Sequence, residues 1–233
     1  MIALQKSMIK LLSFADFITI LNAIFGFLAI LVLFTDITYK IHLSFSFILL
    51  GLLADGLDGI IARRYTKSKI GDFLEPMADM TSMIIAPAVF IFFIYLNQIT
   101  GYQIRQIYIL VALILFLFFG ILRLASFNVL KEKQKYIGLP ASASAILLMV
   151  MAYLNLNIIL ILFASIIIGA LMASNIVFPK PGLRINIIAS ILILLSIILG
   201  NSYYNIAPIM LGLAILIFTF FSPFYVKIVK KGQ

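Results

Sequence analysis

The sequence contains no cysteine, no tryptophan and a single histidine, and these absences restrict the sites that it can build. Without cysteine the chain has no disulfide, so cysteine usage does not indicate a redox compartment. A metal centre made of thiolates or of several imidazoles is also excluded. Any metal that this chain binds is therefore held by oxygen ligands, which favours Mg²⁺, Mn²⁺ or Ca²⁺.

Charged residues are also scarce, at 11% of the chain, whereas 64% of the residues are hydrophobic and the mean hydropathy is +1.23. A soluble domain is about half apolar and about a quarter charged. This composition predicts an all-α integral membrane protein. Residues 1–12 include Lys6 and Lys10 but lack a short apolar core followed by a small-residue cleavage site, so we expect no cleavable signal peptide.

Apolar runs of about 20 residues, the length of a helix that crosses a bilayer, recur along the chain. Residues 1–15 are expected to form an interfacial amphipathic helix. The fifth span is short, and a tight turn at Asn155-Leu156-Asn157 separates it from the sixth. In all we expect eight spans, at 16–35, 40–63, 73–97, 105–130, 139–154, 157–178, 183–200 and 205–229.

The basic residues test this topology. If the N-terminus is cytoplasmic, only Lys40 and Arg105 fall on the opposite side, and Arg123 lies inside the fourth span. This bias predicts a cell-membrane protein with both termini in the cytoplasm. The net charge of +9 then reflects topology, and we expect no nucleic-acid binding. The cytoplasmic set consists of Lys6, Lys10, Arg63, Arg64, Lys67, Lys69, Lys131, Lys133, Lys135, Lys180, Arg184, Lys227, Lys230 and Lys231.

Five of the eight acidic residues fall between Asp55 and Asp79. Asp55 and Asp58 are three residues apart on the second span, and Glu75 and Asp79 are four apart on the third, so each pair shares a helix face. The short connection makes these helices adjacent and antiparallel, and the four carboxylates can converge. Like charges this close need a counter-charge, which predicts one or two divalent cations at the cytoplasmic ends of these spans.

Small residues accompany the acids. Gly51, Asp55, Gly59 and Ala62 share one stripe of the second span, where small side chains let another backbone approach or leave room for a ligand. Arg63 and the basic residues after it could hold a phosphate. Taken singly, such a cation is usually a topology anchor and such an acid a solvated helix end. Four acids paired by helical spacing favour a functional site instead.

The segments D-G-L-D-G-I-I-A-R at 55–63 and G-D-F-L-E-P-M-A-D at 71–79 resemble the signature of the CDP-alcohol phosphatidyltransferases. That signature is D-x-x-D-G-x-x-A-R, seven or eight residues, and then G-x-x-x-D-x-x-x-D. The departure is Glu75, where the family usually has Asp, so the metal geometry must accommodate one more methylene. The matching positions are Asp55, Asp58, Gly59, Ala62, Arg63, Gly71 and Asp79.

The resemblance implies a six-helix core at 16–180, usually homodimeric, followed here by two further spans in 181–233. Asp55, Asp58 and Glu75 would bind two Mg²⁺ or Mn²⁺ ions, and Asp79 would join them as a ligand or act as the base. The CDP-lipid would be bound by Asn22, Gly59, Ala62, Arg63 and Gly71. The implied reaction transfers a phosphatidyl or archaetidyl group from a CDP-linked lipid to a hydroxyl and releases CMP.

Two further regions resemble the phosphatidylserine synthase branch of this family. F-A-D-F-I-T-I-L-N-A-I-F-G-F-L-A-I at 14–30 has Thr19, Asn22 and Gly26 at matching places. G-I-L-R-L-A-S-F-N at 120–128 and Y-I-G-L-P at 136–140 are similar to G-x-x-R-L-x-x-F-N and F-x-G-x-P. The implied acceptor is L-serine, and Arg123, Asn128 and Lys135 would bind it or the phosphates. Alternatively, Arg123 is an anchor that reaches the membrane interface.

Two other functions remain open at this point. The same chemistry could use glycerol phosphate or inositol phosphate, with Lys131, Lys133 and Lys135 supplying cations for the extra phosphate. A cation transporter is the alternative from another class. Transporters place such acids near the bilayer midplane, often in broken helices repeated in two halves. The acids here lie at one edge and have no second half, which favours the transferase.

Overall fold

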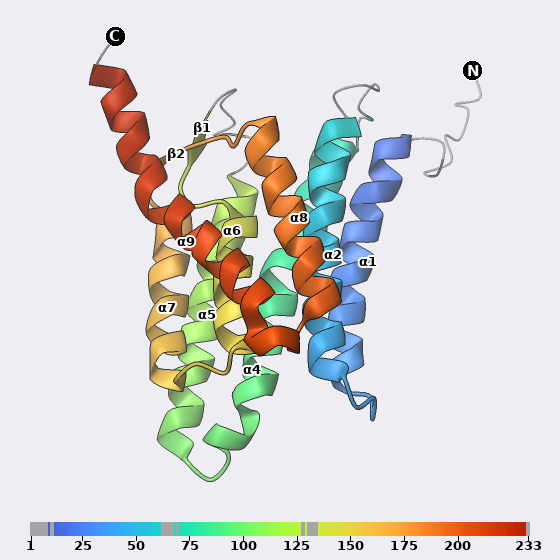
Figure 1. Cartoon of the computed structure of the whole chain (residues 1–233), viewed down its shortest axis with the longest axis vertical. Coiled ribbons are helices and arrows are strands. Elements are labelled where there is room, and N and C mark those ends of the chain that lie inside the picture. Colours follow the sequence, from blue (N-terminus) through green and yellow to red (C-terminus); the bar gives the residue numbers. More distant parts are fainter. Residues whose placement is uncertain are drawn as a thin grey trace, which may run out of the picture.

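The computed structural model describes residues 9, 12–61, 68, 70–126, 129 and 135–231, apart from the side chains at 58–61 and 224–231. Helices standing side by side form one bundle (Figure 1). Each of the eight predicted spans contains a helix. The helices are α1 (Phe14–Leu33), α2 (Lys40–Ile61), α3 (Gly71–Asp79), the π-helix η2 (Met80–Ile85), α4 (Ala86–Ile99), α5 (Gln103–Ala125), α6 (Ala141–Tyr153), α7 (Ile158–Met172), α8 (Leu183–Leu199) and α9 (Ser202–Lys231).

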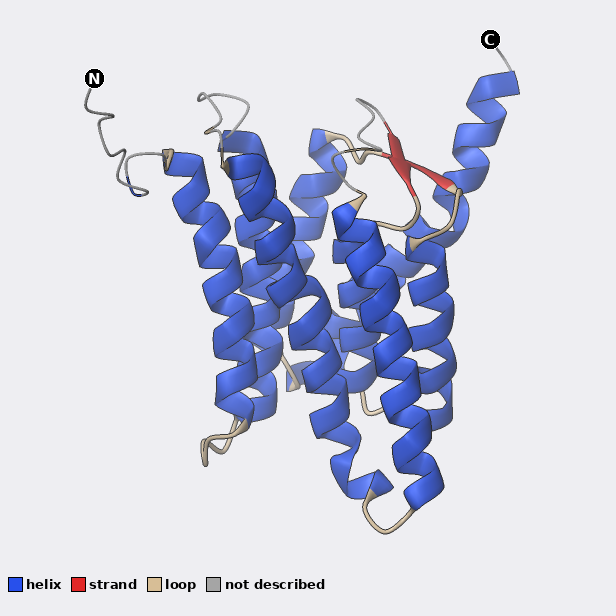
Figure 2. Ribbon diagram, turned by 180° about the vertical axis from the view of Figure 1, so that it is seen from behind, coloured by secondary structure: helices blue, strands red, loops and turns tan. Residues whose placement is uncertain are grey.

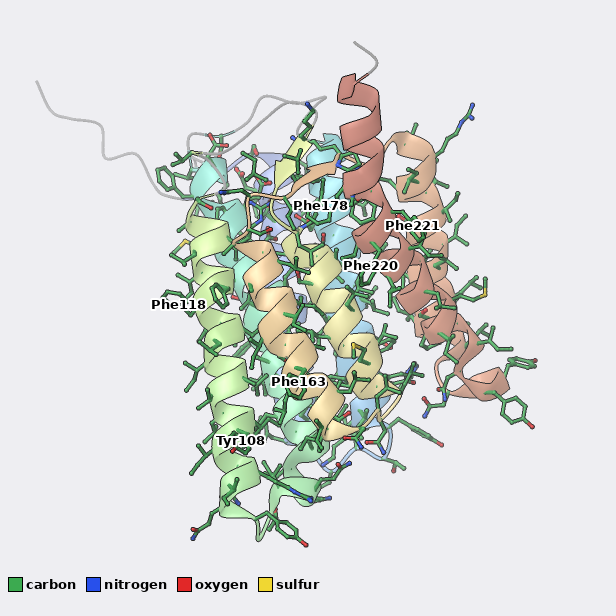
Figure 3. The ribbon with its side chains drawn as sticks, turned by 90° about the vertical axis from the view of Figure 1, so that its left-hand side faces the viewer. Tyr108, Phe118, Phe163, Phe178, Phe220 and Phe221 are labelled. Carbon is green, nitrogen blue, oxygen red and sulfur yellow. The ribbon has the colours of Figure 1, made fainter. Side chains whose placement is uncertain are left out.

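Among the described residues, five helical segments are long and apolar enough to cross a membrane. The remaining helices α6, α7 and α8 are apolar but shorter, at 13, 15 and 17 residues. Large apolar side chains project outward from the bundle, including Tyr108 and Phe118 on α5 and Phe163 on α7 (Figure 3). An apolar outer surface of this kind matches a lipid environment, and it agrees with the prediction of a predominantly helical integral membrane protein. The five segments are Phe14–Leu33, Lys40–Leu57, Gly71–Ile99, Gln103–Ala125 and Ser202–Pro223.

Local capping sets several helix ends. Ser13 and Asp16 form a reciprocal capping box, in which Ser13 N donates to Asp16 Oδ2 at 2.6 Å, so α1 begins at Phe14. Most of the predicted interfacial helix at 1–15 lies outside the described residues. The predicted turn between the fifth and sixth spans is confirmed: Asn155 has φ 51° and Asn157 caps α7 by accepting from Ile159 N.

A small two-stranded sheet departs from the all-helical prediction. Strands β1 (Lys135–Ile137) and β2 (Val177–Pro179) pair antiparallel, with Tyr136 opposite Phe178 (Figure 2). The sixth predicted span was therefore too long, because its helix α7 ends at Met172. Three-residue strands carry too little periodicity to be recognised in an apolar sequence.

The chain that follows β1 covers the end of α7. Gly138 N donates to Ile176 O at 2.7 Å, and Leu139 N donates to Leu171 O at 3.0 Å, which satisfies a carbonyl in the last turn of the helix. Gly138 has φ +79°, and a Cβ there would overlap the Met172 carbonyl. Only glycine fits this position without strain. We call the hydrogen bonds of Gly138 and Leu139 at this end of α7 the Gly138 clamp. The clamp fixes where the segment Leu139-Pro140 enters α6.

Helix α1 packs closely against α3 and η2 of the third span, and α1 runs in the same direction as that span. Asp16 lies beside Gly71, and further along Asn22 contacts Asp79. A Cβ at Gly26 would lie 2.6 Å from Ser82 Cα. From α2, Gly51 leaves room for the Asn22 side chain, as the predicted small-residue stripe requires. These contacts hold the acidic part of the third span against α1 and α2.

The single histidine stabilises the opposite end of the bundle. The Nδ1 atom of His42 on α2 lies 2.9 Å from the Tyr153 hydroxyl on α6, and its Nε2 lies 3.0 Å from the Ile197 carbonyl on α8. The contact therefore joins α8 to helices of the preceding part of the chain. Helix α9 is less enclosed by the rest of the bundle, and 17% of its most apolar stretch is buried.

Candidate functional site

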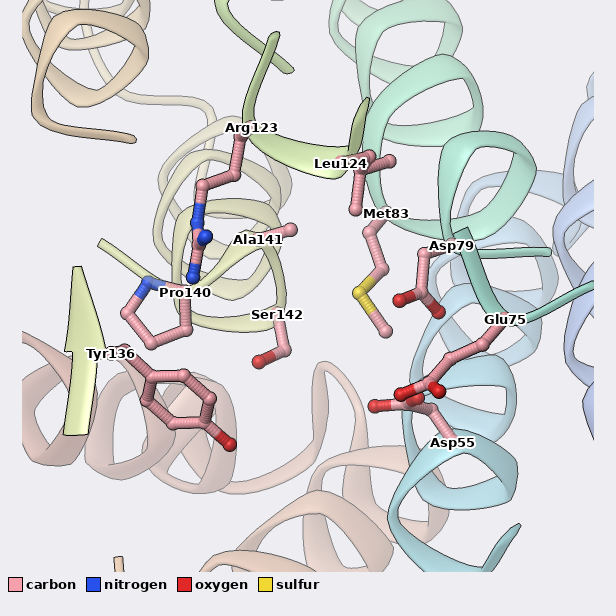
Figure 4. A pocket seen from close by; sticks show the side chains of 10 residues that line it. All are labelled: Asp55, Glu75, Asp79, Met83, Arg123, Leu124, Tyr136, Pro140, Ala141 and Ser142. Atoms are coloured by element: carbon pink, nitrogen blue, oxygen red, sulfur yellow. The ribbon is translucent and has the colours of Figure 1, made fainter. Parts of the chain in front are cut away.

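A pocket of about 90 Å³ lies at the end of the bundle where α3 begins and α5 ends. Three carboxylates stand on one side, and Arg123, Tyr136 and Ser142 stand across from them (Figure 4). We call Asp55, Glu75 and Asp79 the carboxylate wall. We call Arg123, Tyr136, Pro140, Ala141 and Ser142 the β1–α6 wall. Met83 and Leu124 complete the lining.

The carboxylate wall joins residues from two helices. Asp55 comes from α2, and Glu75 and Asp79 come from successive turns of α3, directly before the π-helix η2. The structure thus brings three of the four predicted carboxylates to one pocket, and the Asp58 side chain lies outside the described residues. Among the side chains that are described, no three acidic or histidine groups are gathered closely enough to ligate a single ion. The donors present are oxygens of the kind that Mg²⁺ and Mn²⁺ prefer.

Asn22 lies behind this wall. Its side chain is fully buried, and its Nδ2 donates to Asp79 Oδ1 at 3.0 Å. Its own Oδ1 faces Gly51 and has no hydrogen-bond partner among the described residues. A carboxylate that accepts a hydrogen bond from a buried amide has a restricted orientation. Asn22 therefore supports Asp79 from behind, whereas the sequence placed it at the CDP-lipid.

Arg123 lies in the last turn of α5 and is 7% exposed. Its Nε donates to the Leu139 carbonyl at 3.3 Å, which joins α5 to the segment that leads into α6. An interfacial anchor would extend its guanidinium away from the protein. Burial in the wall of a pocket favours the functional interpretation instead. The same wall includes Tyr136, whose ring centroid lies 5.1 Å from Lys180 Nζ, a cation–π contact.

The other predicted site residues are distributed differently. Gly71 begins α3, its N donates to Ser68 Oγ at 2.9 Å, and a Cβ there would meet Asp16 Oδ1 at 2.8 Å. Gly59 lies near the end of α2, and Lys135 begins β1 without lining the pocket. Ala62, Arg63 and Asn128 lie outside the described residues.

Sequence reasoning missed several lining residues. Tyr136 and Pro140 belong to the quoted Y-I-G-L-P segment, so that motif was an available signal. Ser142 is one of many serines in the chain, and no spacing distinguishes it. Met83 and Leu124 look like ordinary apolar span residues. Their place at the pocket follows from packing between segments that are distant in sequence.

This arrangement suits displacement at phosphorus. Such reactions depend mainly on positioning the reactants and on neutralising charge. Carboxylates that hold divalent ions can neutralise a pyrophosphate, and a carboxylate beside the acceptor can take a proton. The opposite cationic wall can hold an anionic group of the second substrate.

Comparisons with known proteins support the same chemistry. Residues 12–178 match the CDP-alcohol phosphatidyltransferase family. The chain is 34% identical over 172 residues to a CDP-diacylglycerol--serine O-phosphatidyltransferase of Methanocaldococcus jannaschii, covering 73% of this chain and 76% of that protein. It is 31% identical over 181 residues to an archaetidylserine synthase of Methanothermobacter thermautotrophicus, covering 76% and 73%.

A bacterial protein is related to a similar degree. A CDP-diacylglycerol--serine O-phosphatidyltransferase of Helicobacter pylori is 30% identical over 187 residues, which cover 74% of this chain and 76% of that protein. The match over residues 12–178 includes the whole acidic signature and both walls of the pocket. This chain therefore belongs to the CDP-alcohol phosphatidyltransferase family.

Proposed function

We propose that the protein transfers a phosphatidyl or archaetidyl group from a CDP-linked lipid to the hydroxyl of L-serine and releases CMP. The observation that carries the proposal is the pocket in which three carboxylates face a buried arginine. Relatives that are named as serine transferases, with either kind of lipid, support the choice of acceptor. A bilayer position suits a donor whose tails stay in the membrane.

In the proposed reaction, the serine oxygen attacks the phosphorus that carries the lipid. The bond from that phosphorus to the bridging oxygen breaks, and CMP leaves with the bridging oxygen. Asp79 takes the proton of the serine hydroxyl as general base. Support for this role comes from its position on the pocket and from Asn22, which orients the carboxylate by bonding Oδ1.

Members of this family generally depend on divalent metals. We assign Asp55, Asp58, Glu75 and Asp79 as ligands of two ions, Mg²⁺ or Mn²⁺. Bound ions would neutralise the pyrophosphate and the oxygen that leaves. The oxygen-only donor set of the pocket supports this assignment, because it suits hard cations.

The donor and acceptor subsites follow from the motifs. The CDP-lipid is proposed to contact the residues that match the signature, which are Gly59, Ala62, Arg63 and Gly71. Asn22 is proposed to act on the donor indirectly, by orienting Asp79. Arg123, Asn128 and Lys135 are proposed to bind the acceptor or the phosphates. The buried guanidinium of Arg123 favours this role, because its planar fork matches a carboxylate or a phosphate.

We also propose that the pocket opens on the cytoplasmic side, where both termini lie. The distribution of lysines and arginines supports this orientation. The proposed core is 16–180, since the family match ends at 178, and α8 and α9 complete eight spans outside it. The homodimer implied by the family stays a prediction, which a mass measurement on the protein in detergent tests.

The decisive assay measures CMP release by the purified protein with a CDP-linked lipid and either Mg²⁺ or Mn²⁺. Acceptors are L-serine, glycerol phosphate and inositol phosphate, and ester- and ether-linked donors are compared. We expect CMP release that depends on serine and on the metal. Release with only a phosphorylated acceptor would replace the serine assignment. No release with any acceptor, together with metal flux into liposomes lacking CDP-lipid, would favour a transporter.

A further inference from the structure

The β1–α6 wall concentrates positive potential on one side of the pocket. Arg123 is the one cationic side chain among the described residues that line it, and its described hydrogen bond to Leu139 O uses only Nε. The first turn of α6 also lines the pocket, and its N-cap residue Pro140 provides no side-chain cap. Uncapped N–H groups at the start of a helix attract anions. Two separate features therefore favour a negative group at the same place.

Ser142 and Ser144 lie two residues apart on α6 but differ in their surroundings. Ser144 is fully buried and donates to the Pro140 carbonyl at 3.1 Å. Ser142 is partly exposed on the pocket and makes no hydrogen bond to any described residue. Its hydroxyl is therefore available to a ligand, next to the first turn of α6.

Tyr136 supplies a second hydroxyl to this wall. Tyr136 is the middle residue of β1, and the Lys180 ammonium lies 5.1 Å from the centroid of its ring. Tyr136 lines the pocket, and its hydroxyl end is directed away from β1, toward the side on which the carboxylates stand (Figure 4). A phenol oxygen at this place can accept a hydrogen bond from a cationic group of a ligand that is bound between the two walls.

We propose that Ser142 and the first turn of α6 bind the carboxylate of the amino-acid acceptor beside Arg123, and that the Tyr136 hydroxyl accepts a hydrogen bond from its ammonium. This inference rests on the proposed function and adds specificity-determining residues to it. A carboxylate carries one negative charge and matches the one guanidinium of the described wall. A phosphate monoester carries nearly two and would need a further cation.

The test for Ser142 compares Ser142→Ala with Ser144→Ala, which removes the same atom on the same helix outside the pocket. Steady-state CMP release gives KM for serine and for the CDP-lipid. We expect Ser142→Ala to raise the serine KM by about tenfold, as loss of a hydrogen bond to a charged group implies, with an unchanged CDP-lipid KM. Serinol, which lacks the carboxylate, should be used equally by Ser142→Ala and wild type.

The test for Tyr136 uses Tyr136→Phe, with Tyr108→Phe on the outer face of α5 as its control. Tyr136→Phe should raise the serine KM by about fivefold to tenfold. For 3-hydroxypropanoate, which keeps the carboxylate and lacks the ammonium, the variant and wild type should have the same KM. The opposite analogue responses of the two variants assign each residue to its own charged group.

The outcomes separate this inference from the proposed function. If wild type releases CMP with serine but both variants keep the wild-type serine KM, the subsite is wrong and the function stands. If a variant changes the CDP-lipid KM instead, its residue contacts the donor and the inference is overturned. If wild type does not use serine, the proposed function and the subsite fall together.

Discussion

The two walls of the pocket are built in different ways. The carboxylate wall comes from one stretch of 25 residues on α2 and α3, and helical spacing aligns Glu75 with Asp79. The β1–α6 wall is assembled from the end of α5, a short strand and the start of α6. Its position depends on the Gly138 clamp against α7. Under the proposed function, the carboxylates of the reaction centre come from one segment of sequence, whereas the acceptor subsite depends on long-range packing.

Neutralising the carboxylate wall should have the largest effect. Asp55→Asn removes a proposed metal ligand and Asp79→Asn the proposed base, so each should lower kcat by about a thousandfold or more. Asp55→Ala and Asp58→Ala should likewise abolish turnover without unfolding the protein. Asp36→Asn, an exposed acid in the loop at the other end of the bundle, is the control and should behave as wild type. Near wild-type turnover in Asp55→Asn would remove the carboxylate wall from the mechanism.

Gly138→Ala should disturb the β1–α6 wall indirectly, because it disrupts the Gly138 clamp that positions this wall. The left-handed backbone and the overlap with Met172 should cost about 3 kcal/mol of folding stability. For a chain of this size, that corresponds to a fall of roughly 6–12 °C in Tm, measured by thermal unfolding in detergent. Gly56→Ala adds its methyl group to open space on α2 and should leave Tm unchanged or slightly higher. An unchanged Tm in Gly138→Ala would show that the clamp does not support the wall.

Substitutions of Glu75 test the proposed metal site, because Glu75 departs from the family pattern. Glu75→Gln keeps the shape and removes the charge, so kcat should fall by about a hundredfold. Glu75→Asp keeps the charge and restores the family residue, so most activity should remain, with a changed preference between Mg²⁺ and Mn²⁺. Activity titrated against each metal provides the measurement. Wild-type behaviour of Glu75→Gln would mean that another group or water takes that coordination position.

Arg123→Ala tests whether the β1–α6 wall contributes to binding. Removal of a charge-assisted hydrogen bond worth about 1.5–3 kcal/mol should lower kcat/KM by tenfold or more. Arg123→Lys keeps the charge but loses the planar fork, so it should recover only part of the activity. Kinetics on folded protein are compared with its Tm. Reduced expression or Tm with ordinary kinetics would return Arg123 to the role of a membrane anchor.

The sequence was informative where the physical rule is local. Apolar runs identified the helical segments, and spacing by four residues placed Glu75 and Asp79 on the face of α3 that lines the pocket, where Asp55 joins them from α2. The rule fails where contacts are distant in sequence. The pairing of β1 with β2 follows from hydrogen bonds across about 40 residues, so the end of α7 at Met172 was missed.

The surroundings of individual side chains could not be predicted from sequence patterns either. Asn22 was assigned to the CDP-lipid by its place in a motif, and the motif did not reveal that its amide is buried and bonded to Asp79. Ser142 and Ser144 are chemically identical in the sequence, and only the direction of each side chain on α6 distinguishes a pocket hydroxyl from a buried one. Such directions depend on which helices pack against which, and that is a property of the fold.

The most direct test of the central claim follows the oxygen atom of the acceptor. Purified protein is given CDP-linked lipid, divalent metal and L-serine labelled with ¹⁸O in its hydroxyl, and both products are analysed by mass spectrometry. If the two walls bring the serine hydroxyl to the phosphorus that carries the lipid, the label appears in the lipid product and CMP is unlabelled. Unlabelled lipid product, or the formation of a CMP–serine ester with phosphatidic acid, would contradict the account.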